Sequence, residues 1–395
     1  MEDGRNGLPR PPRRIPANAG SLTQLEVPSR PAAPQPPGRR PWLFGRILAG
    51  FVVLLVIIAA GAGAGWFVHE RRLGMNTDEI LKSAGPAVVR VLATTCGSSG
   101  EASGVLIDNG RVLTAASAVA NPRSIVIVTS DGRIRRANLL GTSADGVAVL
   151  QSIGLDGTPM HLAAADPDPK AQRALIGYTA AGKQTINQVG STADPRALSE
   201  VMNAAKLGGP VVDKSGGLIG LVTGATVQAS AIVPLEKLRG YVAASPLGLD
   251  LATAGTCALS RGPQAAVVPA LQVARTPLNV EVQRLFGNYV TLENQQDFRA
   301  LQSLYSARFA KGMTEARDLN NHRTSYFFNP RITDVAPDGS YARMAYDILF
   351  APTATGAGGQ NCNRLDVRFQ LVRVDGKLLI DRTVPMATPV SCDSD

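Results

Sequence analysis

The sequence predicts one membrane-spanning helix followed by two folded domains. The first is a mainly β domain, an antiparallel sandwich or double barrel, and the second is an α+β domain. Three observations support this fold class. A run of 22 residues from Ile47 to Val68 contains no charge, about ten short apolar stretches lie between positions 88 and 233, and helical spacing begins at Thr276. The length of 395 residues and an apolar content of 45% suffice for two cores.

Residues 1–42 are predicted to be a disordered cytoplasmic tail. The first 46 residues contain ten of the 27 prolines, and eight arginines against three acidic residues give them a net charge of +5 out of +9. A segment of this composition cannot bury enough apolar surface to offset the entropy of ordering it. The other 349 residues carry only +4, which argues against a nucleic-acid-binding face on the folded part.

Residues 43–68 are predicted to form the membrane helix. The uncharged run is about 33 Å long as a helix and so can cross a ~30 Å hydrocarbon core. The only tryptophans of the chain, Trp42 and Trp66, lie near its two ends, where the headgroup region favours them. The arginine-rich flank places the N-terminus in the cytoplasm, so we expect a single pass through the cytoplasmic membrane and extracytoplasmic C-terminal domains. A cleaved signal peptide fits the long tail poorly.

Two further features of the chain concern pairing. Gly61, Gly63 and Gly65 form a stripe of small residues in the predicted membrane helix. This stripe could pack against a second copy of the helix in a homodimer. Four cysteines without a CxxC pair argue against a zinc site and for two disulfides, in one of three pairings. We favour one bond in each folded domain, Cys96–Cys257 and Cys362–Cys392; four free thiols are the alternative.

Residues 78–262 are predicted to be the mainly β domain. A short helix from Asp78 and a Gly-Pro break precede the first strand, and Pro234–Ala243 is predicted as a closing helix. Turn residues separate the strands, as expected for an antiparallel sandwich or double barrel. The first predicted strand ends at Val91. The strands predicted after it are Ser103–Ile107, Arg111–Thr114, Ser124–Thr129, Ile134–Leu140, Val147–Gln151, Ala174–Tyr178, Thr185–Gly190, Val211–Val212, Leu218–Thr223 and Gln228–Val233.

Residues 263–275 are predicted as a linker, and residues 276–395 as the α+β domain. Apolar residues at helical spacing predict helices over Val280–Glu293 and Asp297–Phe309. Antiparallel strands follow, with hairpin turns at 338–339 and 375–376. The predicted strands are Ser325–Phe328, Arg331–Val335, Tyr341–Phe350, Leu365–Val374 and Lys377–Val384.

The segment Lys206-Leu207-Gly208-Gly209-Pro210, followed by a strand, a Gly-Gly turn and a second strand, resembles the nucleophile segment of trypsin-like proteases. The order of elements over residues 78–262 resembles the HtrA-type domain, most closely that of membrane-anchored serine proteases of actinobacteria. The resemblance implies a chymotrypsin-like fold of two six-stranded barrels with the active site between them. In that subgroup the two cysteines that match Cys96 and Cys257 are bridged.

All three triad positions implied by this resemblance are degenerate. Ser117 occupies the position of the histidine, Gly146 that of the aspartate with Asp145 one residue early, and Leu207 that of the serine. A shift of one residue along a strand turns a side chain to the opposite face, so Asp145 is a poor substitute. His161, the one histidine in this region, lies away from the motif segments, and a Ser117–Lys206 dyad is disfavoured because Lys206 holds a position that does not point into the cleft. We therefore expect no catalytic residues.

The C-terminal part resembles NTF2-like domains. The order of helices and sheet carries this resemblance, together with the phrase Asn-Gln-Gln-Asp-Phe at 294–298 between two helices. It implies a cone that binds small molecules or peptides, or dimerisation through the sheet. We expect His322 to lie in a solvated polar loop.

Together these features predict a membrane-anchored extracytoplasmic trypsin-like pseudoprotease that acts as a binding or scaffold protein of the cell envelope. The expected partners are the membrane and an envelope protein or peptide, with no cofactor, metal or nucleic acid. The alternatives are an active serine protease with atypical catalytic residues, and a protein that binds a small molecule or peptide through its NTF2-like domain.

Overall fold

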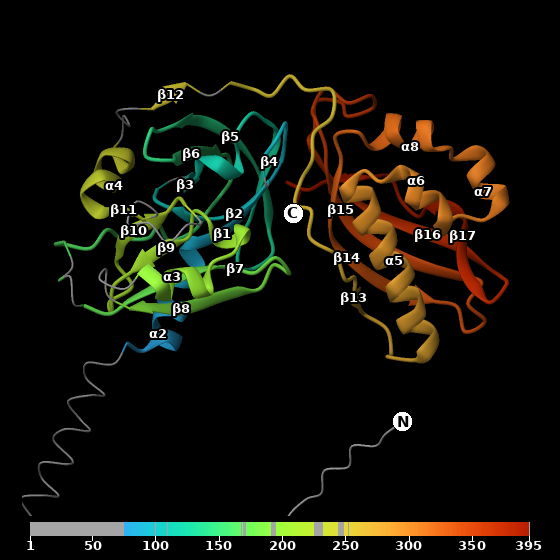
Figure 1. The fold of residues 1–395 in the computed structure, drawn as a ribbon, viewed down its shortest axis with the longest axis horizontal. Coiled ribbons are helices and arrows are strands. Elements are labelled where there is room, and N and C mark those ends of the chain that lie inside the picture. The colour runs from blue at the N-terminus through green and yellow to red at the C-terminus, as the bar shows by residue number, and fades with distance from the viewer. Residues whose placement is uncertain are drawn as a thin grey trace, which may run out of the picture. The chain divides into compact units, whose positions relative to one another are not determined.

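A computed structural model describes residues 75–98, 100–108, 110–166, 168, 171–190, 195–224, 232–243, 249–251 and 253–394 (Figure 1). The predicted tail and the membrane helix at 43–68 lie outside these residues. Within the described part of the chain, no helix has the length and apolarity needed to cross a membrane.

The described chain begins with helix α2 (Thr77–Ala84), as predicted. The side chain of Asn76 caps it by accepting a hydrogen bond from the Glu79 amide at 3.3 Å. Ile80 and Ala84 are its buried residues, and the 3₁₀ turn η1 (Gly85–Ala87), which contains Pro86, leads into the first strand. The first described helix is thereby packed against the apolar core of the β domain.

Six strands close into the first barrel. The sheet has the order β12-β5-β4-β1-β2-β3-β6, and an additional pairing of β5 with β6 closes the ring. Its strands are β1 (Val88–Thr95), β2 (Glu101–Leu106), β3 (Arg111–Ala115), β4 (Pro122–Val128), β5 (Ile134–Thr142), β6 (Val147–Ser152) and β12 (Asp250–Leu251). The chymotrypsin-like β-barrel is thus present, with strands close to the predicted ranges.

Neighbouring residues of a barrel strand belong to different cores. Val147 and Val149 of β6 pack with residues of the second sheet, whereas Ala148 and Leu150 pack in a separate cluster with β1, β3 and β4. Because both faces of β6 are covered, its residues from Val147 to Leu150 are all apolar, whereas β5 alternates between buried and exposed residues.

The second sheet has five strands among the described residues, in the order β11-β10-β9-β7-β8, where a six-stranded barrel was expected. The strands are β7 (Arg173–Tyr178), β8 (Gln184–Gly190), β9 (Pro210–Val212), β10 (Leu218–Val222) and β11 (Ile232–Pro234). Helix α4 (Leu235–Val242) closes the domain as predicted. Helix α3 (Pro195–Val201) was not predicted, although a proline as first helical residue is a typical start signal.

The C-terminal domain contains a six-stranded sheet. Helices pack on this sheet (Figure 1). The strand order is β13-β14-β15-β16-β17, with β18 paired to β16. Its elements are α5 (Pro277–Gln295), α6 (Phe298–Leu301), the 3₁₀ turn η5 (Gln302–Leu304), α7 (Ala307–Gly312), α8 (Glu315–His322), β13 (Ala270–Leu271), β14 (Tyr326–Val335), β15 (Tyr341–Leu349), β16 (Cys362–Val374), β17 (Lys377–Pro385) and β18 (Val390–Ser391). Strand β13 lies within the predicted linker and pairs in parallel with β14.

The helix predicted over residues 297–309 is in fact broken. Tyr305 has an extended backbone and bridges to Ile380 of β17, and Ser306 starts α7 by accepting a hydrogen bond from the Phe309 amide at 3.1 Å. Pairing with the sheet and the serine cap together outweigh the helical spacing of the apolar residues.

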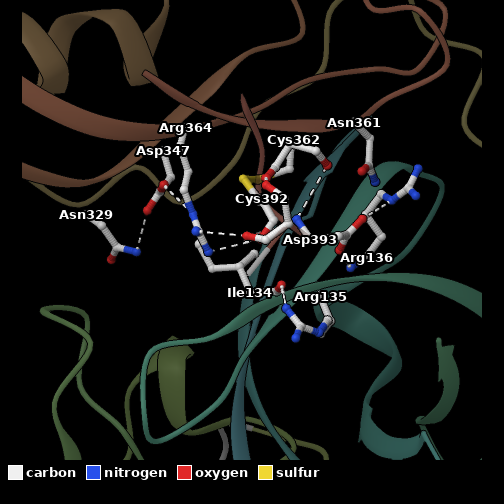
Figure 2. Close-up of a disulfide and its surroundings, with 12 residues drawn as sticks. Ile134, Arg135, Arg136, Asn329, Asp347, Asn361, Cys362, Arg364, Cys392 and Asp393 are labelled. Carbon is white, nitrogen blue, oxygen red and sulfur yellow. Dashed lines mark hydrogen bonds and ion pairs between the residues drawn. A yellow bond between two sulfur atoms is a disulfide. The ribbon is translucent and has the colours of Figure 1, made fainter. Parts of the chain in front are cut away.

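Both favoured disulfides are formed, Cys96–Cys257 and Cys362–Cys392. Figure 2 shows the second, the C-terminal disulfide, close to strand β5 of the first barrel. Asp393 accepts hydrogen bonds there from the backbone amide of Arg136, at 2.8 Å, and from its guanidinium. A shared apolar cluster lies beside this contact and consists of Leu92, Val126, Ile134, Tyr326, Phe328, Leu349 and the two cysteines.

Candidate functional site: the triad positions and a buried acidic cluster

The segment at the position of the nucleophile is a tight loop held by its own backbone. The 3₁₀ turn η3 (Ala204–Lys206) is capped by the side chain of Asn203, which accepts a hydrogen bond from the Lys206 amide at 3.1 Å. The Leu207 amide donates to the Ala204 carbonyl at 3.1 Å, and the Leu207 carbonyl accepts from the Ser103 amide of β2 at 2.7 Å. Leu207 is only 9% exposed and offers no nucleophile.

Glycine at position 208 lets the loop adopt this conformation without strain. Its φ of +76° favours glycine, and a Cβ there would lie 2.3 Å from the Ser103 carbonyl oxygen and 2.5 Å from Oγ1 of Thr114. The Thr114 hydroxyl in turn donates to that carbonyl at 2.6 Å. The adjacent glycines therefore allow this loop to lie directly against the first barrel, which explains them without catalysis.

The side chain of Lys206 is held by structural hydrogen bonds. This side chain is buried, and its ammonium donates to Oδ1 of Asn187 on β8 and to the carbonyl of Val201 at the end of α3, both at 2.7 Å. Burial lowers the pKa of Lys206. The two acceptors keep the ammonium in a structural role, so the geometry gives no support to a dyad with Ser117.

Ser117, at the position of the histidine, is exposed on the 3₁₀ turn η2 (Ala116–Ala118). It lines a shallow hollow of about 330 Å³ that lies on the first barrel. The other lining residues are Ala116, Ala120, Asn121, Leu139, Thr142, Leu251 and Thr253, and neither Leu207 nor Asp145 is among them. The hydroxyl thus has no acid–base group beside it in this hollow.

Gly146, at the position of the aspartate, has a φ of +81° and closes the turn that precedes β6, where its amide donates to the Ser143 carbonyl at 3.0 Å. The neighbouring carboxylate of Asp145 bonds to helix α4 instead, to the ammonium of Lys237 at 2.5 Å and to the hydroxyl of Tyr241 at 2.9 Å. The hydrogen bonds from Lys237 and then Tyr241 hold the pKa of Asp145 below its usual value. Asp145 therefore stabilises the attachment of α4.

The described histidines lie elsewhere. His161 is exposed, and its carbonyl accepts from the amide of Leu218 at the start of β10. His322 belongs to the C-terminal domain, where the prediction of a solvated loop is wrong: it ends helix α8, and its Nδ1 is buried. The helix was missed because Glu-Ala-Arg-Asp-Leu-Asn-Asn-His has almost no apolar residues, although Thr314 before it is a good cap.

His322 belongs to a buried cluster that sequence reasoning did not identify. Candidate ligand atoms of Glu293, Asp318 and His322 all lie within 4.8 Å of one another. Burial raises the pKa of Glu293 to about 8, against a smaller lowering by the hydroxyl of Tyr289, and raises that of Asp318 to about 7. Burial also lowers the pKa of His322 to about 4. One signal was available, since Asp318 and His322 are four residues apart and face the same way on a helix.

Comparison with known proteins finds one family model that matches part of the first domain, and several solved structures that resemble part of the chain. Residues 102–221 match the family described as trypsin-like peptidase domain. The active form of the Rv3671c protease from M. tuberculosis is similar, at 21% identity and a TM-score of 0.38 over 45% of this chain and 88% of that one. The inactive form of Rv3671c protease is similar at 19% identity and a TM-score of 0.35, over 42% of this chain and 91% of that one. A serine endoprotease from Yersinia pestis is similar at 21% identity and a TM-score of 0.37, over 45% of this chain and 74% of that one. No curated protein shows significant similarity to the chain.

Proposed function

We propose that the protein is a membrane-anchored, extracytoplasmic trypsin-like pseudoprotease that binds a protein or peptide of the cell envelope. The observation that carries this proposal is the identity of the three residues at the triad positions. Ser117, Gly146 and Leu207 provide no base, no carboxylate and no nucleophile at the positions where a trypsin-like domain needs them.

The size of the expected rate loss supports the absence of catalysis. In subtilisin, loss of the serine or the histidine alone lowers kcat by about 10⁶. The backbone amide of Leu207, at the position that would help to stabilise an oxyanion, already donates to Ala204. The triad positions thus lack the catalytic side chains, and the Leu207 amide is not free to bind an oxyanion during peptide hydrolysis.

The two disulfides support an extracytoplasmic location, because such bonds persist in oxidising compartments. The uncharged run from Ile47 to Val68 and the arginines before it support a membrane anchor with a cytoplasmic N-terminus. For the C-terminal domain we propose an NTF2-like fold, supported by helices that precede an antiparallel sheet and pack on it.

Labelling of the full chain, purified in detergent, with a fluorophosphonate serine probe tests the absence of catalysis, alongside digestion of an unfolded protein substrate. A trypsin-like protease serves as positive control. We expect neither label nor cleavage, and crosslinking in membranes should then capture an envelope protein. A label that disappears in Ser117→Ala would instead establish an active protease with atypical residues and overturn the proposal.

A further inference from the structure

The acidic cluster of the C-terminal domain joins two helices. Glu293 lies in the last turns of α5, while Asp318 and His322 lie on α8. The spacing of four residues brings Asp318 and His322 to the same face of α8, the arrangement by which a single helix can offer two ligands to one ion. Glu293 therefore adds a third ligand atom from a separate element.

The position of Glu293 is fixed by its neighbour in the sequence. The side chain of Asn294 donates to the Phe327 carbonyl at 2.9 Å and accepts from the Phe327 amide at 2.7 Å, which ties the end of α5 to β14. Glu293 itself is only 1% exposed, and among the described residues neither of its carboxylate oxygens has a hydrogen-bond partner of ordinary geometry. A buried carboxyl group without such partners is costly unless another group satisfies it.

The other two side chains are arranged like ligands with supporting partners. The hydroxyl of Tyr305 and the amide of Gln302 both donate to Oδ2 of Asp318, each at 3.2 Å. Hydrogen bonds of this kind orient a carboxylate that uses its remaining capacity on a metal ion. The ring of His322 packs against Phe327, with centroids 5.3 Å apart, and its buried Nδ1 has no hydrogen-bond partner among the described residues.

We propose that Glu293, Asp318 and His322 bind one divalent transition-metal ion. One imidazole and two carboxylates suit ions such as Zn²⁺, Mn²⁺ and Fe²⁺. Metal–ligand distances of about 2.0–2.2 Å require the three donors to lie closer together than their present limit of 4.8 Å. A small inward movement of α8 can supply this, because most of its residues are exposed and the helix is only eight residues long.

The ion would complete the buried cluster. Two carboxylates balance the charge of a divalent cation, so the bound site is neutral and the oxygens of Glu293 gain a partner. Three protein ligands leave a fourth position for water or another small ligand, as in open metal sites. This inference concerns the C-terminal domain and does not depend on the proposed loss of catalysis in the trypsin-like domain.

The test uses the full chain, stripped with a chelator and titrated with Zn²⁺, with bound zinc measured by elemental analysis after gel filtration. We expect one zinc per chain and a zinc-dependent rise in melting temperature. Glu293→Gln and His322→Gln should each lower zinc affinity at least as much as loss of an outer-shell partner, about 10- to 100-fold. Glu315→Gln, an exposed carboxylate on the same helix, and His161→Gln, an exposed histidine of the other domain, serve as matched controls and should leave affinity unchanged.

Failure to retain zinc, with no change in melting temperature, would overturn the proposal. Stoichiometric zinc that survives in both Glu293→Gln and His322→Gln would also overturn it, since the ion would then lie elsewhere. Circular dichroism in chelator shows whether the variants fold. If one does not, the other variant decides, and if neither folds, the zinc-dependent rise in the melting temperature of the unaltered chain decides.

Discussion

Gly208→Ala tests whether the loop at the nucleophile position is kept for the fold. The new alanine would have to keep the left-handed backbone conformation of Gly208, at a cost of about 1–2 kcal/mol in folding free energy. Its methyl group would also lie 2.3 Å from the Ser103 carbonyl and 2.7 Å from the Ala115 amide nitrogen. Such overpacking costs roughly 1–3 kcal/mol more, so we expect a total loss of about 2–5 kcal/mol.

Gly132→Ala is the matched control. Gly132 has a similar φ of +84°, but its Cβ would meet nothing within 4 Å, so only the backbone cost applies. Thermal denaturation followed by circular dichroism should place Gly208→Ala below Gly132→Ala by the contact term alone, roughly 2–12 °C at about 2–4 °C per kcal/mol. Equal melting temperatures would refute the reasoning that contacts with the first barrel require this glycine.

Three further predictions concern the first domain and the chain end. Leu207→Ser restores a hydroxyl but no base, so we expect no fluorophosphonate label. A label on the Leu207→Ser variant would mean that another side chain acts as general base for the new hydroxyl. Asp145→Asn should lower the melting temperature only slightly at pH 7, because the ion pair with Lys237 that it removes is exposed to solvent. Because the folded pKa of Asp145 is depressed, its contribution is complete above about pH 4 and is lost as the pH falls through the folded pKa, so the two proteins should converge in acid, and a constant difference would contradict this assignment. Replacing both cysteines of the C-terminal disulfide by alanine opens a loop with a sequence separation of 30 and should lower the free energy of unfolding by about 3–4 kcal/mol through chain entropy. The loss is measured as a fall in the denaturation midpoint. Added reductant should lower the midpoint of this variant further only by the effect of breaking the other disulfide.

Much of the first domain could be predicted because its signals are local. Turn residues such as Asp131-Gly132 separate short apolar runs, and a run of this kind, bounded at both ends, is recognisable as a buried strand without knowledge of the partner strand. The disulfide pairing followed from assigning one bond to each domain. The positions of Ser117, Gly146 and Leu207 followed from motif segments that keep their spacing.

The buried acidic cluster could not be predicted in the same way. Glu293 is separated from Asp318 by 25 positions in the printed sequence, and the burial of a carboxyl group depends on elements that pack over it rather than on its neighbours. Helix α8 carries little apolar periodicity, so no helix was predicted there and His322 was expected in a loop. The break at Tyr305 likewise depends on pairing with β17, a contact between distant segments.

The contact between Asp393 and Arg136 has a consequence during synthesis. The partners are 257 residues apart, so β5 is complete long before the C-terminal residues that contact it exist. At about 5–20 residues per second, Arg136 waits roughly 13–50 s for Asp393, and Leu92, Val126 and Ile134 lack the contacts of Tyr326, Phe328 and the last cysteine over a similar period. Nascent and prematurely terminated chains therefore present an uncovered apolar surface on a finished barrel, which makes this face the one on which we expect a chaperone to act.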